Sequence, residues 1–158
     1  MPFAKLLGVV LLALVALLCG SWLCRFERMR CKQAQALFEM MQYVRAQIDC
    51  FSLSLPKILK QTDAQLLRDC GASRAPASFE ELLLQCEPLP TDKMRALLFD
   101  FAAALGKDYR TEQLRLCNYY IERFSALCEE LRRELDRRLK LMRLLPCTLG
   151  AALILLLI

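Results

Sequence analysis

The sequence predicts an all-α protein: a membrane-anchored helical bundle with hydrophobic helices at both termini. Three observations predict it. An uncharged apolar run lies near each end, apolar residues between the runs recur at three- and four-residue spacing, and Gly and Pro fall at element borders. We expect an N-terminal transmembrane anchor over residues 1–24, a cytoplasmic helical bundle over 25–143 and a short hydrophobic membrane segment over 144–158.

The composition excludes several classes of protein. The chain has 158 residues, of which 56% are hydrophobic and 25% charged, and its mean hydropathy is +0.30. A chain this apolar has enough surface to bury, which excludes intrinsic disorder. It contains no histidine, the commonest general base and metal ligand, and only five glycines, with no glycine-rich phosphate loop. We therefore expect no enzymatic activity, no cofactor and no small-molecule substrate.

The cysteines do not form a metal-binding pattern. A zinc site needs two close pairs such as C-x-x-C, and the shortest separations here are Cys19 to Cys24 and Cys24 to Cys31. Most of the nine lie inside apolar helical patterns and not in loop-rich sequence, which favours reduced thiols over a disulfide scaffold. They are Cys19, Cys24, Cys31, Cys50, Cys70, Cys86, Cys117, Cys128 and Cys147.

The first apolar run, Leu6–Cys24, has 19 residues without a charge and would reach ~28 Å as a helix, about one hydrocarbon core. A cleaved or lipidated signal is the alternative, but a small-x-small cleavage pattern is missing and Leu18 precedes Cys19. Four cations follow the run and only Lys5 precedes it. By the positive-inside rule the chain beyond the run is cytoplasmic. The four are Arg25, Arg28, Arg30 and Lys32.

The second apolar run, Leu144–Ile158, follows a stretch of six cations, and its start is therefore expected on the cytoplasmic side as well. Its 15 residues make ~22 Å of helix, and Pro146 and Gly150 lie inside it. Three interpretations stay open: a short spanning helix that Leu141 and Met142 lengthen, a re-entrant or interfacial segment, and a helix buried against protein. The first places both termini outside the cytoplasm. The six cations are Arg132, Arg133, Arg137, Arg138, Lys140 and Arg143.

The region between the runs begins with a helix from Phe26 to about Cys50 that continues out of the anchor. Its apolar stripe consists of Leu37, Met41, Val44 and Ile48. Ser54 is expected to cap a short helix that Leu55-Pro56 open, and a second short helix covers Ala64–Cys70 and stops at Gly71. A loop over Gly71–Ala77 follows.

Two further helix starts carry capping residues. Ser78 and Glu81 form a capping box, so the adjacent carboxylates of Glu80 and Glu81 need no catalytic role. Thr91 or Asp92 caps a helix that is expected to end at Gly106 in a left-handed conformation. That helix carries Met94, Leu97, Leu98 and Phe101.

The last helix is expected to be about thirty residues long, with Thr111 as its cap and a largely apolar seam whose three- and four-residue spacing continues without a break. Such a seam needs an equally long antiparallel or coiled partner, for which Phe26–Cys50 is the only candidate within the chain. Arg138 interrupts the seam, and we expect it to extend toward lipid headgroups. The outer face carries acid-before-base pairs that predict either a solvated face or a partner surface: Glu129–Arg133, Glu134–Arg138 and Asp136–Lys140. The seam consists of Leu114, Cys117, Ile121, Phe124, Cys128, Leu131, Leu135, Arg138 and Met142.

The charge pattern favours lipid over nucleic acid as a partner. Residues 25–143 hold 21 basic and 17 acidic side chains, a net charge of +4 concentrated at the two membrane borders. Basic residues are interleaved with acidic ones, and no nucleic-acid-binding motif is visible.

The order of these features resembles the stage III sporulation protein AB family over nearly the whole chain. The features are Lys5-Leu6-Leu7-Gly8 in the anchor, the arginine-rich stretch before Leu37–Ile48, Ser54-Leu55-Pro56, Leu105-Gly106 ahead of Gln113, and a long charged helix running through Leu149-Gly150 into Leu-Ile-Leu-Leu-Leu-Ile. The cysteine richness and Cys50-Phe51 depart from the family pattern.

The resemblance implies a non-catalytic platform in the channel complex between mother cell and forespore, located in the inner, mother-cell membrane with its bulk in the cytoplasm. It implies that the soluble part is similar to the type II secretion F domain. It also implies contacts with a secretion-type ATPase and with other components of the complex, and it allows the chain to form an oligomer. A small membrane-bound regulator or sensor is the alternative. Our candidate partner contacts are Gly106, Asp108, Gln113, Glu130, Arg133 and Arg137.

Overall fold

The structure is a computed structural model that describes the backbone of residues 2–51, 54–107 and 109–157. Before residue 20 it describes the side chains of residues 8, 10, 11, 14, 15, 17 and 18, and after residue 141 it describes none. The predictions about Asp108 and about the tail side chains 144–158 therefore lie outside the described residues.

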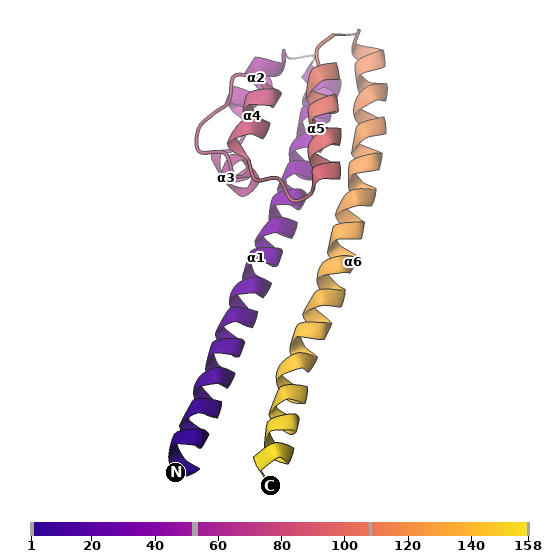
Figure 1. The fold of residues 1–158 in the computed structure, drawn as a ribbon. Helices are drawn as coiled ribbons and strands as arrows, with labels where there is room; N and C mark the ends of the chain where they lie inside the picture. Colours follow the sequence, from indigo (N-terminus) through magenta and orange to yellow (C-terminus); the bar gives the residue numbers. More distant parts are fainter. Residues whose placement is uncertain (1, 52–53, 108, 158) are drawn as a thin grey trace. The chain divides into compact units, whose positions relative to one another are not determined.

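Six helices make up the described chain, and it contains no strand, which confirms the predicted all-α class. They are α1 (Pro2–Phe51), α2 (Leu55–Gln61), α3 (Ala64–Cys70), α4 (Phe79–Gln85), α5 (Asp92–Ala104) and α6 (Arg110–Leu157) (Figure 1). The chain divides into two compact units. We call residues 30–131 the central unit, and residues 1–29 with 132–158 the terminal unit.

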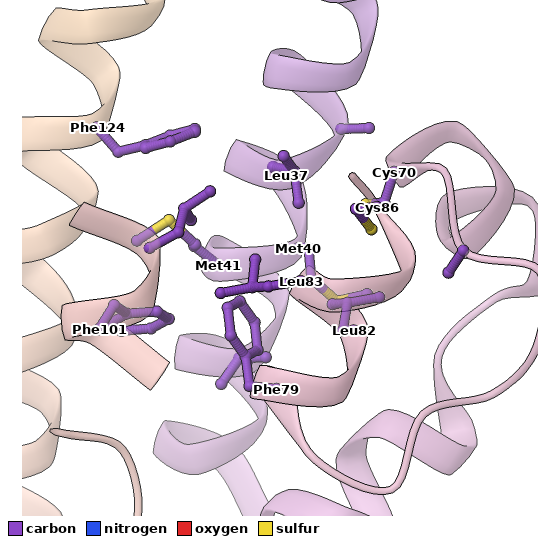
Figure 2. Close-up of a cluster of buried hydrophobic side chains, with 14 of the residues drawn as sticks. Leu37, Met40, Met41, Cys70, Phe79, Leu82, Leu83, Cys86, Phe101 and Phe124 are labelled. Carbon is purple, nitrogen blue, oxygen red and sulfur yellow. The ribbon is translucent and has the colours of Figure 1, made fainter. Parts of the chain in front are cut away.

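The core of the central unit forms on the predicted stripe of α1. Leu37, Met41 and Val44 are fully buried and Ile48 nearly so, which confirms that stripe. Figure 2 shows Leu37, Met40 and Met41 of α1 facing side chains from α4, α5 and α6. The rings of Phe79 on α4 and Phe101 on α5 meet edge to face, with centroids 5.2 Å apart. The remaining fully buried large side chains are Ile58, Leu59, Leu82, Leu83, Met94, Leu98 and Phe124.

Within the central unit α6 packs antiparallel to α1, as its seam predicts. Arg110 near the start of α6 contacts Asp49 near the end of α1, whereas Cys128 Sγ lies 3.8 Å from the carbonyl oxygen of Ala34, earlier on α1. The seam residues Cys117, Phe124 and Leu131 are buried, and Leu114, Ile121 and Cys128 are half-buried.

The limits of α6 differ from the prediction. The helix has 48 residues instead of about thirty, since its backbone continues helically through Pro146 and Gly150. It also begins at Arg110, with the carbonyl of Tyr109 accepting from the Gln113 N–H at 2.9 Å, so Thr111 lies in the first turn and the predicted Thr111 cap is wrong.

Most of the other predicted helix ends are confirmed, with two corrections. Ser54 holds the cap position of α2, but its side chain makes no capping hydrogen bond and only its carbonyl accepts, from the backbone of Lys57 and Ile58. Gly71 ends α3 with a φ of 104°, a left-handed conformation that costs glycine least. The helix α5 ends at Ala104, two residues before the predicted Gly106.

One side chain of α1 fastens the ends of two short helices. Gln33 Nε2 donates to the carbonyl oxygens of Cys70 and Cys86, at 3.1 and 2.6 Å. These carbonyls lie at the C-terminal ends of α3 and α4, where the helix itself offers no donor. A single amide thus joins both helices to α1.

In the terminal unit, described residues of α1 present large apolar side chains to the exterior. Val10, Leu11, Leu14, Val15, Leu17, Leu18 and Trp22 are all about half exposed or more. Across the described residues no helix has the combination of length and apolar character needed to cross a membrane.

Candidate partner-contact surfaces

The predicted partner contacts lie in three places. Gly106 is exposed and Gln113 half-buried, both where α5 passes into α6, and Asp108 between them lies outside the described residues. Glu130 is exposed on α6, with its Oε1 3.8 Å from Lys93 Nζ. Arg133 and Arg137 are exposed in the terminal unit.

These residues do not make one site. Gln113 and Glu130 are seventeen residues apart on one straight element, a separation of ~26 Å along the helix axis. The corner near Gly106 is therefore a surface distinct from the charged stretch that begins at Glu130.

The corner includes two aromatic side chains that the sequence prediction missed. Arg110 Nη2 donates to the carbonyl oxygen of Asp49 and lies 3.3 Å from its Oδ1, which joins the end of α1 to the start of α6. Phe51 follows Asp49 by two residues, Tyr109 directly precedes Arg110, and their side chains are 66% and 91% exposed. The only signal in the sequence was that both lie outside the apolar stripes. We call Phe51, Gly106, Tyr109 and Gln113 the corner surface.

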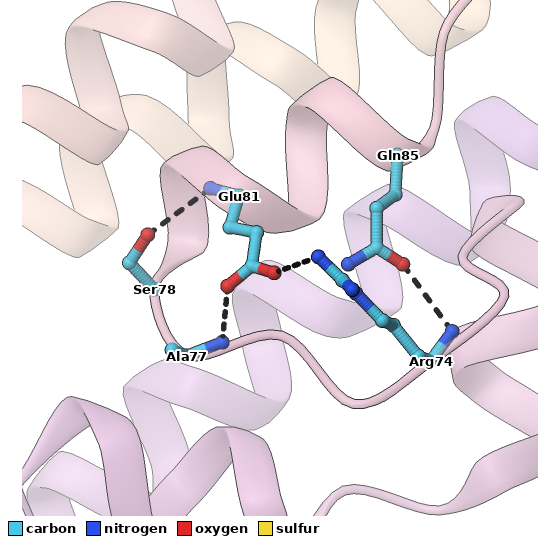
Figure 3. Close-up of polar contacts among 5 residues, drawn as sticks. All are labelled: Arg74, Ala77, Ser78, Glu81 and Gln85. Atoms are coloured by element: carbon cyan, nitrogen blue, oxygen red, sulfur yellow. Dashed lines mark hydrogen bonds and ion pairs between the residues drawn. The ribbon is translucent and has the colours of Figure 1, made fainter.

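The predicted cap of α4 is present, with Ser78 at the cap position and Glu80 and Glu81 in the first turn. Ser78 Oγ accepts from the Glu81 N–H at 3.1 Å (Figure 3). The Glu81 carboxylate reaches one residue further back than a capping box requires, accepting from the Ala77 N–H at 2.7 Å and from Arg74 Nη2 at 2.9 Å. The hydrogen bond from Ala77, with Arg74 contributing, lowers the pKa of Glu81. A lowered pKa holds a surface carboxylate ionised, which suits a structural cap.

The described cysteines are free thiols, and the most buried of them are poor nucleophiles. Burial raises the pKa of Cys70, with the neighbouring Cys86 adding to the effect, and raises that of Cys86 to about 12. Burial also raises the pKa of Cys117 and of Cys128 to about 11. Among the described residues no group of cysteine and acidic side chains could hold a metal ion. Cys19 and Cys147 have no described side chains.

A buried acid lies beside the arginine that interrupts the α6 seam. Arg138 Nη1 is 2.9 Å from Glu27 Oε1 in the terminal unit, and Glu27 is only 9% exposed. The expectation that Arg138 extends toward headgroups is corrected, because its guanidinium is held by a carboxylate of α1. This ion pair fixes which residues of the two helices lie opposite each other.

The comparison with protein families extends over nearly the whole chain. A family model described as stage III sporulation protein AB matches residues 5–158. The chain belongs to the stage III sporulation protein AB family. The match includes all of α2 to α6 and nearly all of α1, so the corner surface and the Glu27–Arg138 pair both lie within the family region.

No curated protein and no solved structure matches the chain in the corresponding searches. Membership of the stage III sporulation protein AB family connects the chain with sporulation. The similarity of residues 25–143 to a type II secretion F domain stays a prediction from the sequence.

Proposed function

We propose that the chain is a non-catalytic membrane platform of the sporulation channel complex between mother cell and forespore, and that its central unit engages a cytoplasmic secretion-type ATPase. The match to the stage III sporulation protein AB family over residues 5–158 carries the proposal. The platform would lie in the inner, mother-cell membrane with residues 25–143 in the cytoplasm.

Both ends of the chain support the membrane attachment. Leu6–Cys24 and Leu144–Ile158 contain no charged residue, and each borders a cluster of cations on its inner side. Described side chains of the first run, such as Leu11, Leu18 and Trp22, are exposed. Exposed apolar side chains in a row are unfavourable in water and favourable in the hydrocarbon core of a bilayer.

The chemistry of the central unit supports a structural role over a catalytic one. Its perturbed titratable groups have packing explanations: Glu81 caps α4, and the thiols of Cys70, Cys86 and Cys117 fill the core. Catalytic groups are normally perturbed toward reactivity, whereas burial makes these thiols less reactive.

The corner surface is the best candidate for the ATPase contact. Phe51 and Tyr109 present large exposed rings beside the Arg110–Asp49 contact, and aromatic anchors of this kind dominate protein interfaces. The contact joins the end of α1, which carries Phe51, to the start of α6, which Tyr109 directly precedes.

Co-purification from sporulating cells tests the proposal. The full chain is extracted in mild detergent as wild type, as the double variant F51S/Y109S and as the control L84S, which removes an exposed leucine of α4 far from the corner in sequence. We expect wild type and L84S to retain a hexameric ATPase, and F51S/Y109S to lose most of it. Recovery of only a kinase or phosphatase would support the regulator in place of the platform.

A further inference from the structure

We propose that the terminal unit carries a binding collar for the headgroups of anionic phospholipids, formed by Trp22, Phe26 and the exposed cations of α1 and α6 around the Glu27–Arg138 pair. This inference rests on the membrane attachment proposed above and adds to it a lipid class and the residues that select it.

The collar begins with an aromatic pair on α1. The rings of Trp22 and Phe26 stack with centroids 6.3 Å apart and an interplanar angle of 16°. Trp22 is 70% exposed, and Met29, one turn beyond Phe26, is exposed on the same side of the helix. An indole offers an apolar ring and a polar N–H, which places tryptophan at the boundary between headgroups and hydrocarbon.

Cations border this aromatic face on one side. At about 100° per residue, Arg25 lies about 60° and Arg28 about 120° around the helix from Trp22, while Glu27 lies about 140° away in the other direction. This spacing agrees with the burial, because Arg25 and Arg28 are exposed and Glu27 is buried. The acid thus faces α6, and the cations remain at the exterior beside the rings.

The ion pair brings the cations of α6 to the same level. From Glu27 and Arg138 the two helices continue side by side toward their chain ends (Figure 1). Arg25 and Lys140 are each two residues beyond the pair, or ~3 Å, and Trp22 is five residues beyond it, or ~7.5 Å. Trp22 therefore lies toward the apolar run, Arg28, Arg132 and Arg137 lie toward the charged interior, and Arg25 and Lys140 lie between them, the order of a bilayer boundary.

The charge of this region favours anionic over zwitterionic lipid. Residues 25–29 and 132–140 hold seven basic and three acidic side chains, a net charge of +4. Two of the acids are within reach of Arg138: Glu27 at 2.9 Å and Glu134 at 3.9 Å. Arg25, Arg28, Arg132, Arg137 and Lys140 are exposed and available to phosphate groups.

Trp22 makes the collar testable, because it is the only tryptophan in the chain. The full-length protein is reconstituted into mixed phosphatidylcholine and phosphatidylglycerol vesicles in which one lipid at a time carries brominated acyl chains that quench indole fluorescence. We expect brominated phosphatidylglycerol to quench Trp22 as though enriched roughly threefold over its bulk fraction. Raising the salt from 0.1 M to 1 M, which shortens the screening length from ~10 Å to ~3 Å, should remove the enrichment.

Two matched variants assign the effect to residues. R25Q/R28Q/R132Q/R137Q removes four cations of the collar, and K57Q/K60Q/K107Q/R115Q removes four exposed cations of the central unit. We expect the first to abolish the enrichment and the second to retain it. Enrichment that persists in the first variant, or resists salt in the wild type, would overturn the collar.

The outcomes distinguish the selection of anionic headgroups by the collar from the membrane attachment on which the collar depends. Equal quenching by the two brominated lipids would refute headgroup selection while leaving membrane attachment in place. Absence of quenching by either lipid would refute the attachment itself.

Discussion

Arg138 of α6 and Glu27 of α1 form an ion pair with 2.9 Å between Nη1 and Oε1, at a position where the α6 seam otherwise calls for an apolar side chain. Glu27 is buried while the Arg138 side chain stays partly exposed. The pair accounts for an arginine at this position, since a buried carboxylate is stable only with hydrogen-bond and charge partners.

Replacing Arg138 by Gln should destabilise the helix pair of the terminal unit. The change removes a cation from a buried carboxylate, and we expect a loss of about 1–3 kcal/mol in the free energy of unfolding. Denaturant unfolding of the full chain in detergent micelles measures it. The control is E134Q, which breaks the exposed 3.9 Å contact on the same arginine and should cost no more than about 0.5 kcal/mol. Equal losses in both variants would contradict a special role for Glu27.

Gly71→Ala should cost more stability than Gly106→Ala. Both glycines have positive φ, 104° and 82°, and a side chain there costs about 1–2 kcal/mol. At Gly71 the added Cβ would also lie 3.3 Å from Gln33 Nε2 and 3.5 Å from the Cα of Cys86, whereas nothing lies within 4 Å at Gly106. Thermal unfolding of the two variants side by side compares the costs. If G106A proved as costly as G71A, the Gln33 contact would not be a tight one.

Glu81→Gln should lower stability at neutral pH and make little difference in acid. The folded state lowers the pKa of Glu81 below its ordinary value of 4.5, so its contribution is present above that pH and disappears as the pH falls through the folded-state pKa. The free energies of unfolding of wild type and E81Q should differ at pH 7, and this difference should become smaller below about pH 4.5. The control is E80Q at the adjacent exposed carboxyl, which should cost less stability than E81Q at pH 7. A difference that stayed constant down to pH 2 would contradict the capping account.

Thiol reagents should modify Cys50 well before Cys86 in the folded protein. Cys50 is exposed at the end of α1, whereas Cys86 is buried and its pKa of about 12 leaves roughly one thiolate in ten thousand at pH 8. Mass spectrometry after a brief maleimide pulse reads the order of labelling, and C50S identifies the early product. In denaturant, Cys50 and Cys86 should be modified at similar rates. Rapid labelling of Cys86 without denaturant would show that the C-terminal end of α4 is accessible to the reagent in the folded protein.

The elements that could be predicted from the sequence are those that local rules determine. The stripe of Leu37 and Met41 follows from helical periodicity, and Gly71 from the conformation that a helix end needs. The cap at Thr111 failed because α6 begins at Arg110, two residues before the start that a Thr111 cap implies, and sequence patterns locate helix ends only to within one or two residues.

The candidate surfaces depended on long-range contacts that no local pattern contains. The partner of Arg138 is 111 residues away along the chain, so its pairing with Glu27 could not be read from the seam. Phe51 and Tyr109 become one surface only because Arg110 joins two helix ends. The predicted contacts also fell into separate places because helical rise puts Gln113 far from Glu130.

Alkaline carbonate extraction of membranes from cells that express the full chain tests the proposed membrane attachment, because it releases peripheral proteins and leaves integral ones in the bilayer. We expect the chain to stay in the membrane pellet. Recovery of the chain in the carbonate supernatant, or in the soluble fraction after lysis without detergent, would contradict it.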